Sequence, residues 1–285
     1  MKETSNYHLE ITPKSSIFKL NLKELWNYKD LLFLFVRRDF VAVYKQTVLG
    51  PLWFVIQPIL TSVMQLLIFT KVAKLSVDGM PPILFYLSGN IMWQYFAGCL
   101  TVTSNTFRGN AGIFGKVYFP RLILPMSLVI SQLLKFGIQF GLFLVVWVWF
   151  LSGNKTNVSI NPNSFMLLLP LLVMMMAALS LGLGMIISSL TTKYRDFSFL
   201  LGFVVQLAMY ASVVILPLSA VPQQYRWIIL ANPMTAIIET FRHAFMGTGV
   251  INWLYLGYSF GFMLVVLSIG VIVFNKVEKT FMDTV

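Results

Sequence analysis

Six long apolar blocks alternate with short polar segments along this 285-residue chain. All ten acidic residues lie outside the blocks, which are Leu52–Ala73, Pro82–Ser104, Leu122–Leu151, Phe165–Leu190, Ser198–Ser219 and Leu254–Phe274. A helix rises about 1.5 Å per residue, so each block is long enough to cross a hydrocarbon layer of about 30 Å. Backbone amides in lipid must be paired locally, which favours helices. The pattern predicts an all-α membrane protein with six transmembrane helices.

The segment before the first block, residues 22–49, is amphipathic rather than uniformly apolar. Its apolar residues recur at helical spacing, at Leu32, Phe35, Val36, Phe40, Val43 and Tyr44. Charged residues alternate with them, among them Arg37, Arg38, Asp39 and Lys45. This pattern favours a basic helix in the membrane interface, with an ordinary solvated helix as the alternative. A break at Gly50-Pro51 then turns the chain into the first span.

The polar segment between the fifth and sixth blocks predicts a second unusual helix. Asn232 is suited to cap a helix that begins at Pro233, and the apolar face that follows ends near Gly247. The helix is too short to cross a bilayer, and its other face carries Glu239, Arg242 and His243. Together with the short element Pro222–Leu230, this helix is expected to form a re-entrant or interfacial helical pair on the outer side. A helix that only caps the bundle is the alternative.

The charge distribution predicts which side of the membrane each segment occupies. The net charge is +11, and with the N-terminus inside, fifteen lysines and arginines fall in cytoplasmic segments against five in outer segments or helix ends. This asymmetry places both termini in the cytoplasm and indicates attraction to anionic membrane lipids rather than nucleic acid. The first thirty residues lack the apolar core of a signal peptide. Residues 1–50 are therefore expected to form a cytoplasmic N-terminus, 51–275 the six-helix domain and 276–285 a cytoplasmic tail.

Several kinds of chemistry are excluded or disfavoured. Gly115-Lys116 resembles the end of a phosphate-binding loop, but Asn110 and Val117 stand where a glycine and a hydroxyl residue are required. Two histidines and one cysteine cannot supply a histidine-rich metal site or an intrachain disulfide. The apolar blocks contain no carboxylate, which argues against ion-coupled transport and intramembrane hydrolysis. We therefore expect no catalytic residues, no metal and no cofactor in this chain.

Three of the apolar blocks carry aligned polar or aromatic side chains. Such faces usually turn toward other helices or toward a water-filled path. The candidate path residues are Gln57, Thr61 and Gln65 in the first block, Ser131, Lys135 and Gln139 in the third, and Phe199, Phe203 and Tyr210 in the fifth. Aromatic and amide groups suit sugars, although contacts between helices explain any single residue equally well. Lys135 either extends toward the cytoplasmic interface or faces the path.

The loop Thr106–Pro120 mixes aromatic and basic residues. Its candidates for contact with another molecule are Phe107, Arg108, Phe114, Lys116 and Tyr118. Such a loop can anchor in the membrane interface, or its aromatic side chains can enter a groove on a cytoplasmic partner.

Several motifs together resemble the ABC-2 type permeases, in particular those that export O-antigen, capsular polysaccharide or teichoic acid. The resemblance covers residues 22–280 and has four parts: the run from Phe35 through Gln57-Pro58, the stretch KVYFPRLILP at Lys116–Pro125, TKYRDFSFL at Thr192–Leu200, and Asn232-Pro233-Met234 with Glu239, Phe241 and Arg242. The family has the type V exporter architecture. The resemblance implies a homodimer in the cytoplasmic membrane with two copies of a separate ATP-binding subunit, which binds the ATP and magnesium. The implied substrate is a lipid-linked glycan.

The resemblance also implies roles for named segments. Residues 22–49 become an interfacial gate helix, the loop Thr106–Pro120 docks on the ATPase, and Pro222–Gly247 forms the outer gate. The gate-helix residues are Arg37, Arg38, Asp39, Tyr44, Lys45 and Gly50, and the outer-gate residues are Glu239, Arg242 and His243. The chain departs from its relatives at Ala42, Val43 and Lys135, where basic residues or an acid are common. An exporter of drugs or small lipids, or a membrane-embedded transferase, are the alternative functions.

Overall fold

The structure is a computed structural model that describes residues 22–45, 47–114, 119–153, 160–249 and 251–281. Within these ranges the chain is all-helical and has no strands. The α-helices are α1 (Leu22–Asn27), α2 (Lys29–Tyr44), α3 (Trp53–Gln65), α4 (Pro82–Ser104), α5 (Thr106–Gly109), α6 (Ala111–Phe114), α7 (Ile123–Leu151), α8 (Leu169–Thr191), α9 (Phe197–Tyr210), α10 (Arg226–Ala231), α11 (Pro233–Met246) and α12 (Trp253–Phe281). The prediction of an all-helical fold is confirmed.

Shorter helical pieces extend or connect these helices. The 3₁₀ turn Gly50–Leu52 leads into α3, which continues as the π-helical segment Leu66–Val72. The 3₁₀ segment Ser164–Leu168 leads into α8. Two further 3₁₀ turns, Leu218–Ala220 and Gln223–Tyr225, lie between α9 and α10.

Among the described residues, four helical segments are both long and apolar enough to cross a membrane. They are Gly50–Val72, Ile123–Leu151, Ser164–Thr191 and Trp253–Glu278. The second apolar block forms α4, which has 23 residues but a more polar composition and lies mostly buried among its neighbours. The fifth block forms the shorter apolar helix α9. The chain therefore has the character of a multi-pass membrane protein.

The helix in the fifth block ends earlier than predicted. The apolar composition extends to Ser219, but α9 ends at Tyr210 and a turn follows it. The Asn232 amide nitrogen donates to the carbonyls of Ala208 and Ala211, at 3.2 and 3.1 Å, and so pairs the end of the helix. Hydropathy alone could not locate this end, because the capping amide comes from a later segment of the chain.

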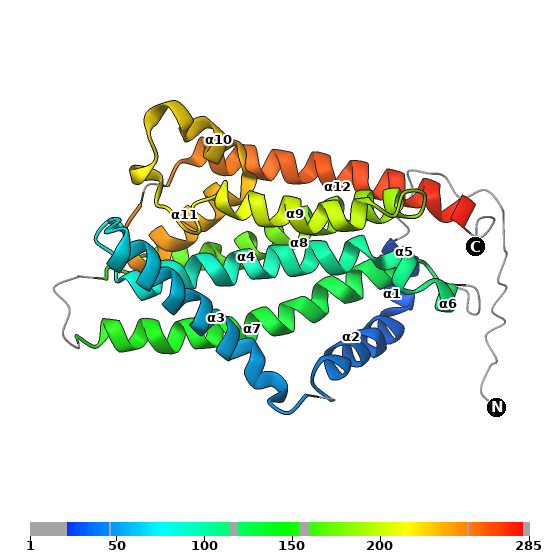
Figure 1. The fold of residues 1–285 in the computed structure, drawn as a ribbon. Coiled ribbons are helices and arrows are strands. Elements are labelled where there is room, and N and C mark those ends of the chain that lie inside the picture. The colour runs from blue at the N-terminus through cyan, green and yellow to red at the C-terminus, as the bar shows by residue number, and fades with distance from the viewer. Residues whose placement is uncertain (1–21, 46, 115–118, 154–159, 250, 282–285) are drawn as a thin grey trace.

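Helix α4 forms the centre of the bundle. It packs against α7 on one side and α8 on the other, and α8 packs in turn against α12. The long helices run roughly side by side, while α3 crosses the front of the bundle obliquely (Figure 1). Helices α10 and α11 lie at one end, which we call the α11 end; α5, α6 and the last residues of α12 lie at the opposite end, the α6 end (Figure 1).

Small residues allow close contact between α8 and α12. A Cβ atom added to Gly270 of α12 would lie 2.5 Å from the carbonyl oxygen of Gly182 in α8, and one added to Gly182 would lie 2.7 Å from the Cα of Leu267. Helices in lipid associate through van der Waals packing rather than through the hydrophobic effect, so close backbone approach at small residues is a main source of their affinity.

Candidate functional site

The amphipathic segment at the N-terminal side forms α2, which packs against α7. Phe35 and Val36 are buried on the side that faces the bundle, whereas Arg37 is exposed. Arg38 forms an ion pair with Asp39, with 2.7 Å between Nη2 and Oδ1. An exposed pair of neighbours such as this one contributes little stability. The predicted amphipathic character is therefore present, with its apolar side against α7.

The remaining gate-helix candidates lie at or beyond the end of α2. Lys45 is exposed directly after the helix, and Gly50 opens the turn into α3 with a φ of 50°. That left-handed backbone conformation favours glycine. The side chain of Tyr44 lies outside the described part of the structure.

Lys135 of α7 lies near an acid that the sequence pattern did not connect with it. No acidic residue occurs in the apolar blocks, but Asp39 of α2 interacts electrostatically with Lys135. The ammonium also lies 5.6 Å from the ring centroid of Phe54 in α3. Because Asp39 precedes the first block by more than ten residues, only the packing of α2 on α7 could reveal this electrostatic interaction.

Two of the predicted path residues, Gln65 and Gln139, form hydrogen bonds with neighbouring helices. Asn90 of α4 donates to Ser62 Oγ and to Gln65 Oε1 of α3, at 2.9 and 2.8 Å. Gln139 of α7 donates to Gln94 of α4 at 2.9 Å. These residues therefore hold helices together in the described chain, as the alternative interpretation of the polar faces expected.

The other path candidates divide into two groups. Ser131 Oγ donates to the Ser127 carbonyl at 2.8 Å and lies 3.5 Å from the Val36 carbonyl of α2. Thr61 Oγ1 donates to the carbonyl of Gln57, and the Gln57 side chain is exposed on α3. On α9, three aromatic side chains are exposed: Phe199, Phe203 and Tyr210. The structure thus turns the α9 aromatic residues outward, whereas Ser131 lies against α2.

The aromatic residues of the loop between α4 and α7 lie inside the protein. Phe107 is fully buried and stacks on Phe274 of α12, with ring centroids 4.5 Å apart. Phe114 is also buried, 5.9 Å from Phe119, which lies 5.7 Å from Phe35 of α2. The expectation that aromatic side chains project from this loop is therefore wrong for Phe107 and Phe114. Both rings are removed from solvent by packing in the aromatic cluster at the α6 end, which is favourable for large apolar side chains.

Among the other residues of this loop, Arg108 is exposed in α5. Lys116 and Tyr118 lie outside the described residues. Arg108 is thus the loop candidate whose described side chain is available to another molecule.

The local signals at the α11 end produced the predicted helix. The Asn232 side chain accepts a hydrogen bond from the Met234 amide at 3.0 Å, Pro233 occupies the first helical position, and Gly247 ends α11 with a φ of 72°. Helix α10 precedes it, so two short helices stand where the pair was expected.

Arg242 of α11 is fully buried, although the pattern placed it on the polar face. Its Nη1 donates to the Val213 carbonyl at 2.6 Å, and its Nη2 donates to the Phe85 carbonyl at 3.0 Å. Its guanidinium also stacks on the Phe85 ring, 3.7 Å from the ring centroid. Arg242 therefore joins α11 to α4 and to the turn that follows α9.

A glycine in α4 makes room for this guanidinium. A Cβ atom added to Gly89 would lie 2.7 Å from Nη2 of Arg242 and 3.1 Å from the Cα of Val214. The sequence signals that could have indicated the site are the Ser88-Gly89 pair within an apolar block, together with an arginine on a helix too short to span a membrane.

Glu239 and His243 flank Arg242 on α11. Glu239 Oε1 lies 3.5 Å from Arg242 Nη1. Burial raises the pKa of the Glu239 carboxyl above its ordinary value, and the neighbouring guanidinium opposes that shift. His243 Nδ1 lies 3.0 Å from the Gly249 carbonyl, which ties α11 to the segment leading into α12. The three predicted outer-gate residues are therefore neighbours in space, and each makes contacts of its own.

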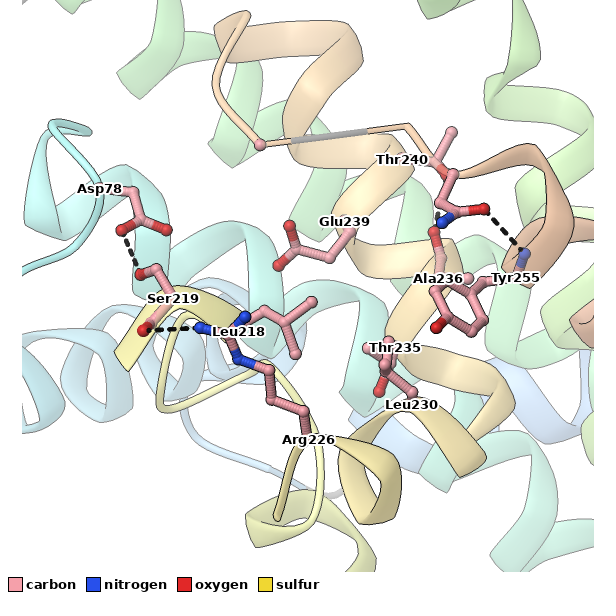
Figure 2. Close-up of a pocket in the computed structure, with 12 residues that line it drawn as sticks. Asp78, Leu218, Ser219, Arg226, Leu230, Thr235, Ala236, Glu239, Thr240 and Tyr255 are labelled. Carbon is pink, nitrogen blue, oxygen red and sulfur yellow. Dashed lines mark hydrogen bonds between the residues drawn. The ribbon is translucent and has the colours of Figure 1, made fainter. Parts of the chain in front are cut away.

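A cavity of about 320 Å³ opens beside Glu239. Figure 2 shows Asp78 and Arg226 on one side of it, Thr240 and Tyr255 on the other, and the Glu239 carboxylate between them. The lining combines carboxylates, a guanidinium, hydroxyls, an amide and an aromatic ring, contributed by Asp78, Leu218, Ser219, Arg226, Leu230, Thr235, Ala236, Glu239, Thr240, Gly249, Asn252 and Tyr255. Such a set can form hydrogen bonds with a small polar ligand.

The candidate site offers binding groups rather than reaction chemistry. In the described ranges of the chain, no three His, Cys, Asp or Glu side chains gather in a way that could hold a metal ion. The single cysteine, Cys99, is buried in α4.

Comparison with known proteins gives a consistent picture. Residues 30–246 match the family described as ABC-2 type transporter. An O-antigen export system permease protein RfbA of Klebsiella pneumoniae is 29% identical over 267 residues, which cover 93% of this chain and 97% of the relative. The polysialic acid transport protein KpsM of Escherichia coli is 24% identical over 83% of this chain and 89% of its own. The capsule polysaccharide export inner-membrane protein CtrC of Neisseria meningitidis is 24% identical over 273 residues, which cover 90% of this chain and 95% of CtrC.

Proposed function

The chain belongs to the ABC-2 type transporter family, and from this premise we propose that it is the permease of an exporter for O-antigen or a related capsular polysaccharide. The observation that carries the proposal is the similarity to O-antigen export permeases over nearly the full length of both chains. A permease of this family is a transport protein rather than an enzyme, and it acts with an ATP-binding subunit. The molecule moved is a lipid-linked glycan.

The proposed topology has six spans with both termini in the cytoplasm. The four long apolar segments are joined by α4, whose 23 residues would extend about 35 Å, and by α9 with the turn that follows it. Residues 1–50 form the cytoplasmic N-terminus with its interfacial helix, 51–275 the transmembrane domain and 276–285 the tail. The α6 end then faces the cytoplasm and the α11 end faces outward. Like its relative CtrC, the chain resides in the inner membrane.

Cysteine labelling can test this topology because the native Cys99 is buried. In spheroplasts, a membrane-impermeant maleimide should label Gln224→Cys, which lies before α10, but should label Lys193→Cys, after α8, only once the membrane is broken. Both positions are exposed. If only the four long apolar segments crossed the membrane, position 193 would lie outside and label in intact spheroplasts. That result would reject six spans.

The proposed assembly contains two copies of this chain and two ATP-binding subunits. In such a homodimer, a transport path between the two copies would be lined by the exposed side chains of Gln57, Phe199, Phe203 and Tyr210 on α3 and α9. Helix α2, with Arg37, Arg38 and Lys45, would gate the cytoplasmic side among the lipid head groups. Helices α10 and α11 would gate the outer side, with Arg242 holding α11 in place.

The loop between α4 and α7 is the proposed contact with the ATP-binding subunit, which binds the ATP and magnesium. Its exposed residue Arg108 would lie at the surface of that contact. The buried rings Phe107 and Phe114 would transmit a movement of the loop to α12 and α2 through the aromatic cluster. A push on the loop would then reach the gate helix without any contact between the ATPase and α2.

Export in cells tests the proposal. Cells that lack this chain should retain the polysaccharide on the cytoplasmic side of the membrane, and the intact gene should restore surface polysaccharide. Arg108→Glu should lower restored export by about tenfold or more, because reversing a charge in a contact opposes association by several kcal/mol. Lys276→Glu, a matched reversal on an exposed residue of α12, should export normally.

Immunoblotting measures the amount of polysaccharide at the cell surface. A second immunoblot of the membrane fraction shows whether each variant of the chain is present in the membrane. Normal export by Arg108→Glu would reject the role of this loop. Normal surface polysaccharide in cells without the chain would reject the proposed function.

A further inference from the structure

The cavity beside Glu239 is formed where several segments of the α11 end meet. Asp78 comes from the loop between α3 and α4, Ser219 and Arg226 from the segment after α9 and the start of α10, Glu239 from α11 and Tyr255 from α12. Elements from four parts of the chain therefore meet around one polar space. In the proposed topology this space lies on the outer side of the membrane, where the exported molecule emerges.

The cavity wall is fixed by contacts that do not use all of its polar groups. Ser219 Oγ donates to Asp78 Oδ1, which docks the loop between α3 and α4 (Figure 2). Asp78 itself has a left-handed backbone, with a φ of 54°, a conformation that is uncommon outside glycine and is concentrated at functional sites. Arg226 Nε donates to the Val221 carbonyl at 3.0 Å. Arg226 Nη2 also donates to the Ser219 carbonyl at 3.4 Å (Figure 2). Within the described residues, the second oxygen of Asp78 and Nη1 of Arg226 are therefore the groups left for a ligand in the cavity.

The opposite wall supplies groups of different character. Asn252 Oδ1 accepts from the amides of Leu254 and Tyr255, at 3.0 and 3.4 Å, so the remaining polar group of its side chain is the donor amide NH₂. Tyr255 adds an aromatic ring with a hydroxyl, and Leu230 and Ala236 add apolar surface. Carboxylate acceptors on one side, an amide donor on the other and a ring nearby match a ligand that presents both hydroxyls and C–H surface.

Charge and size narrow the class of ligand. The charged side chains of the lining are Asp78, Glu239 and Arg226, and Arg242 lies 3.5 Å from Glu239 as its counter-charge. The four formal charges sum to zero, so the cavity has no excess positive charge to attract a phosphate or a carboxylate. The volume of about 320 Å³ is at the lower end of the range of about 300–1,000 Å³ typical of ligand pockets. A single ring-sized polar molecule fits this space better than a long segment of chain.

We propose that this outer cavity is a binding subsite for one uncharged sugar residue of the exported glycan. The inference rests on the proposed function, because the glycan is what brings a sugar to this side of the membrane. The subsite would hold an emerging residue while the next one advances through the path, and so would oppose backward movement.

Saturation-transfer NMR on the full chain, reconstituted with its ATP-binding subunit in nanodiscs, tests the proposal directly. The probes are the uncharged methyl glycosides of glucose, galactose, mannose, rhamnose and N-acetylglucosamine, with methyl glucuronide as the acidic comparison. At least one uncharged glycoside should receive saturation. Methyl glucuronide should bind at least about tenfold more weakly, because its carboxylate would lie among the carboxylates of Asp78 and Glu239 without an excess of positive charge to offset it.

A pair of matched variants locates the binding. Ala236→Leu places three additional carbons into the cavity and should abolish the saturation transfer. Ala231→Leu makes the same change at an exposed position at the end of α10, outside the cavity lining, and should leave it intact. Equal transfer in the wild type and in Ala236→Leu, tighter binding of methyl glucuronide, or no transfer from any uncharged glycoside in the wild type would overturn the subsite.

The export assay separates this inference from the proposed function. If the wild-type chain exports polysaccharide but the binding results go against the subsite, only the subsite is rejected. If the chain supports no polysaccharide export at all, the proposed function fails, and the assignment of a glycan to this cavity fails with it.

Discussion

Replacing Arg242 by methionine should destabilise the α11 end of the protein by about 3–5 kcal/mol, the cost typical of removing one partner from a buried charged network. The guanidinium donates to the carbonyls of Phe85 and Val213 and lies beside Glu239. Without it these acceptors stay buried and unpaired, and a carboxylate loses its counter-charge. Methionine fills much of the same volume, so the loss reflects hydrogen bonds and charge rather than a cavity.

The apparent melting temperature of the detergent-solubilised protein, followed by the monodisperse fraction in size-exclusion chromatography, measures this effect. We expect a decrease of about 10 °C or more for Arg242→Met. Arg242→Lys should recover little of it, because a single ammonium cannot reproduce a planar fork of five donors. Arg195→Met, at an exposed arginine in the turn after α8, should lie within a degree or two of the wild type. A wild-type melting temperature for Arg242→Met would show that the buried network is not a source of stability.

Replacing Gly270 by valine should separate α12 from α8 and markedly lower the amount of folded protein. The first added carbon would lie 2.5 Å from the Gly182 carbonyl oxygen, which belongs to the backbone and cannot turn aside as a side chain would. Overpacking of this kind costs about 1–3 kcal/mol, and a β-branched residue against backbone belongs at the upper end of that range. Gly182→Ala should give a smaller effect of the same sign, since its Cβ would meet the Leu267 backbone at 2.7 Å.

A glycine elsewhere on the same helix provides the control. A Cβ added to Gly261 of α12 has nothing within 4 Å, so Gly261→Ala should be neutral or stabilise the helix by about 0.5–1 kcal/mol. The measurement compares the expression level and the melting temperature of Gly270→Val with those of Gly261→Ala. The close contact would be disproved if Gly270→Val and Gly261→Ala behaved alike.

The sequence anticipated the helical elements better than their orientations. Apolar blocks without acids indicated helices in six places, and all six contain one. Asn232-Pro233 and Gly247 marked the two ends of α11, because capping groups act on backbone within one turn of themselves. The end of α9 was not anticipated, since the side chain that pairs its last carbonyls, Asn232, comes 21 and 24 residues after them in the chain.

The candidate site was anticipated in part. Glu239, Arg242 and His243 were recognised as one cluster, but the arginine was expected on a polar face and is fully buried. Phe107 and Phe114 were expected at a surface and pack inside an aromatic cluster. The cavity residues Asp78, Asn252 and Tyr255 were not anticipated, because they come from separate loops and helices that carry no shared motif.

By itself the sequence determined the apolar and polar alternation, the absence of acids from the apolar blocks and the caps of α11, because each depends on composition or on groups a few residues apart. Only the tertiary structure decided which side of each helix faces a neighbour. It paired Asn90 with Gln65, brought Asp39 near Lys135 and surrounded Arg242 with carbonyl groups. Such contacts join helices distant in the chain, and in an apolar bundle a buried polar group is stable only where packing brings it a partner.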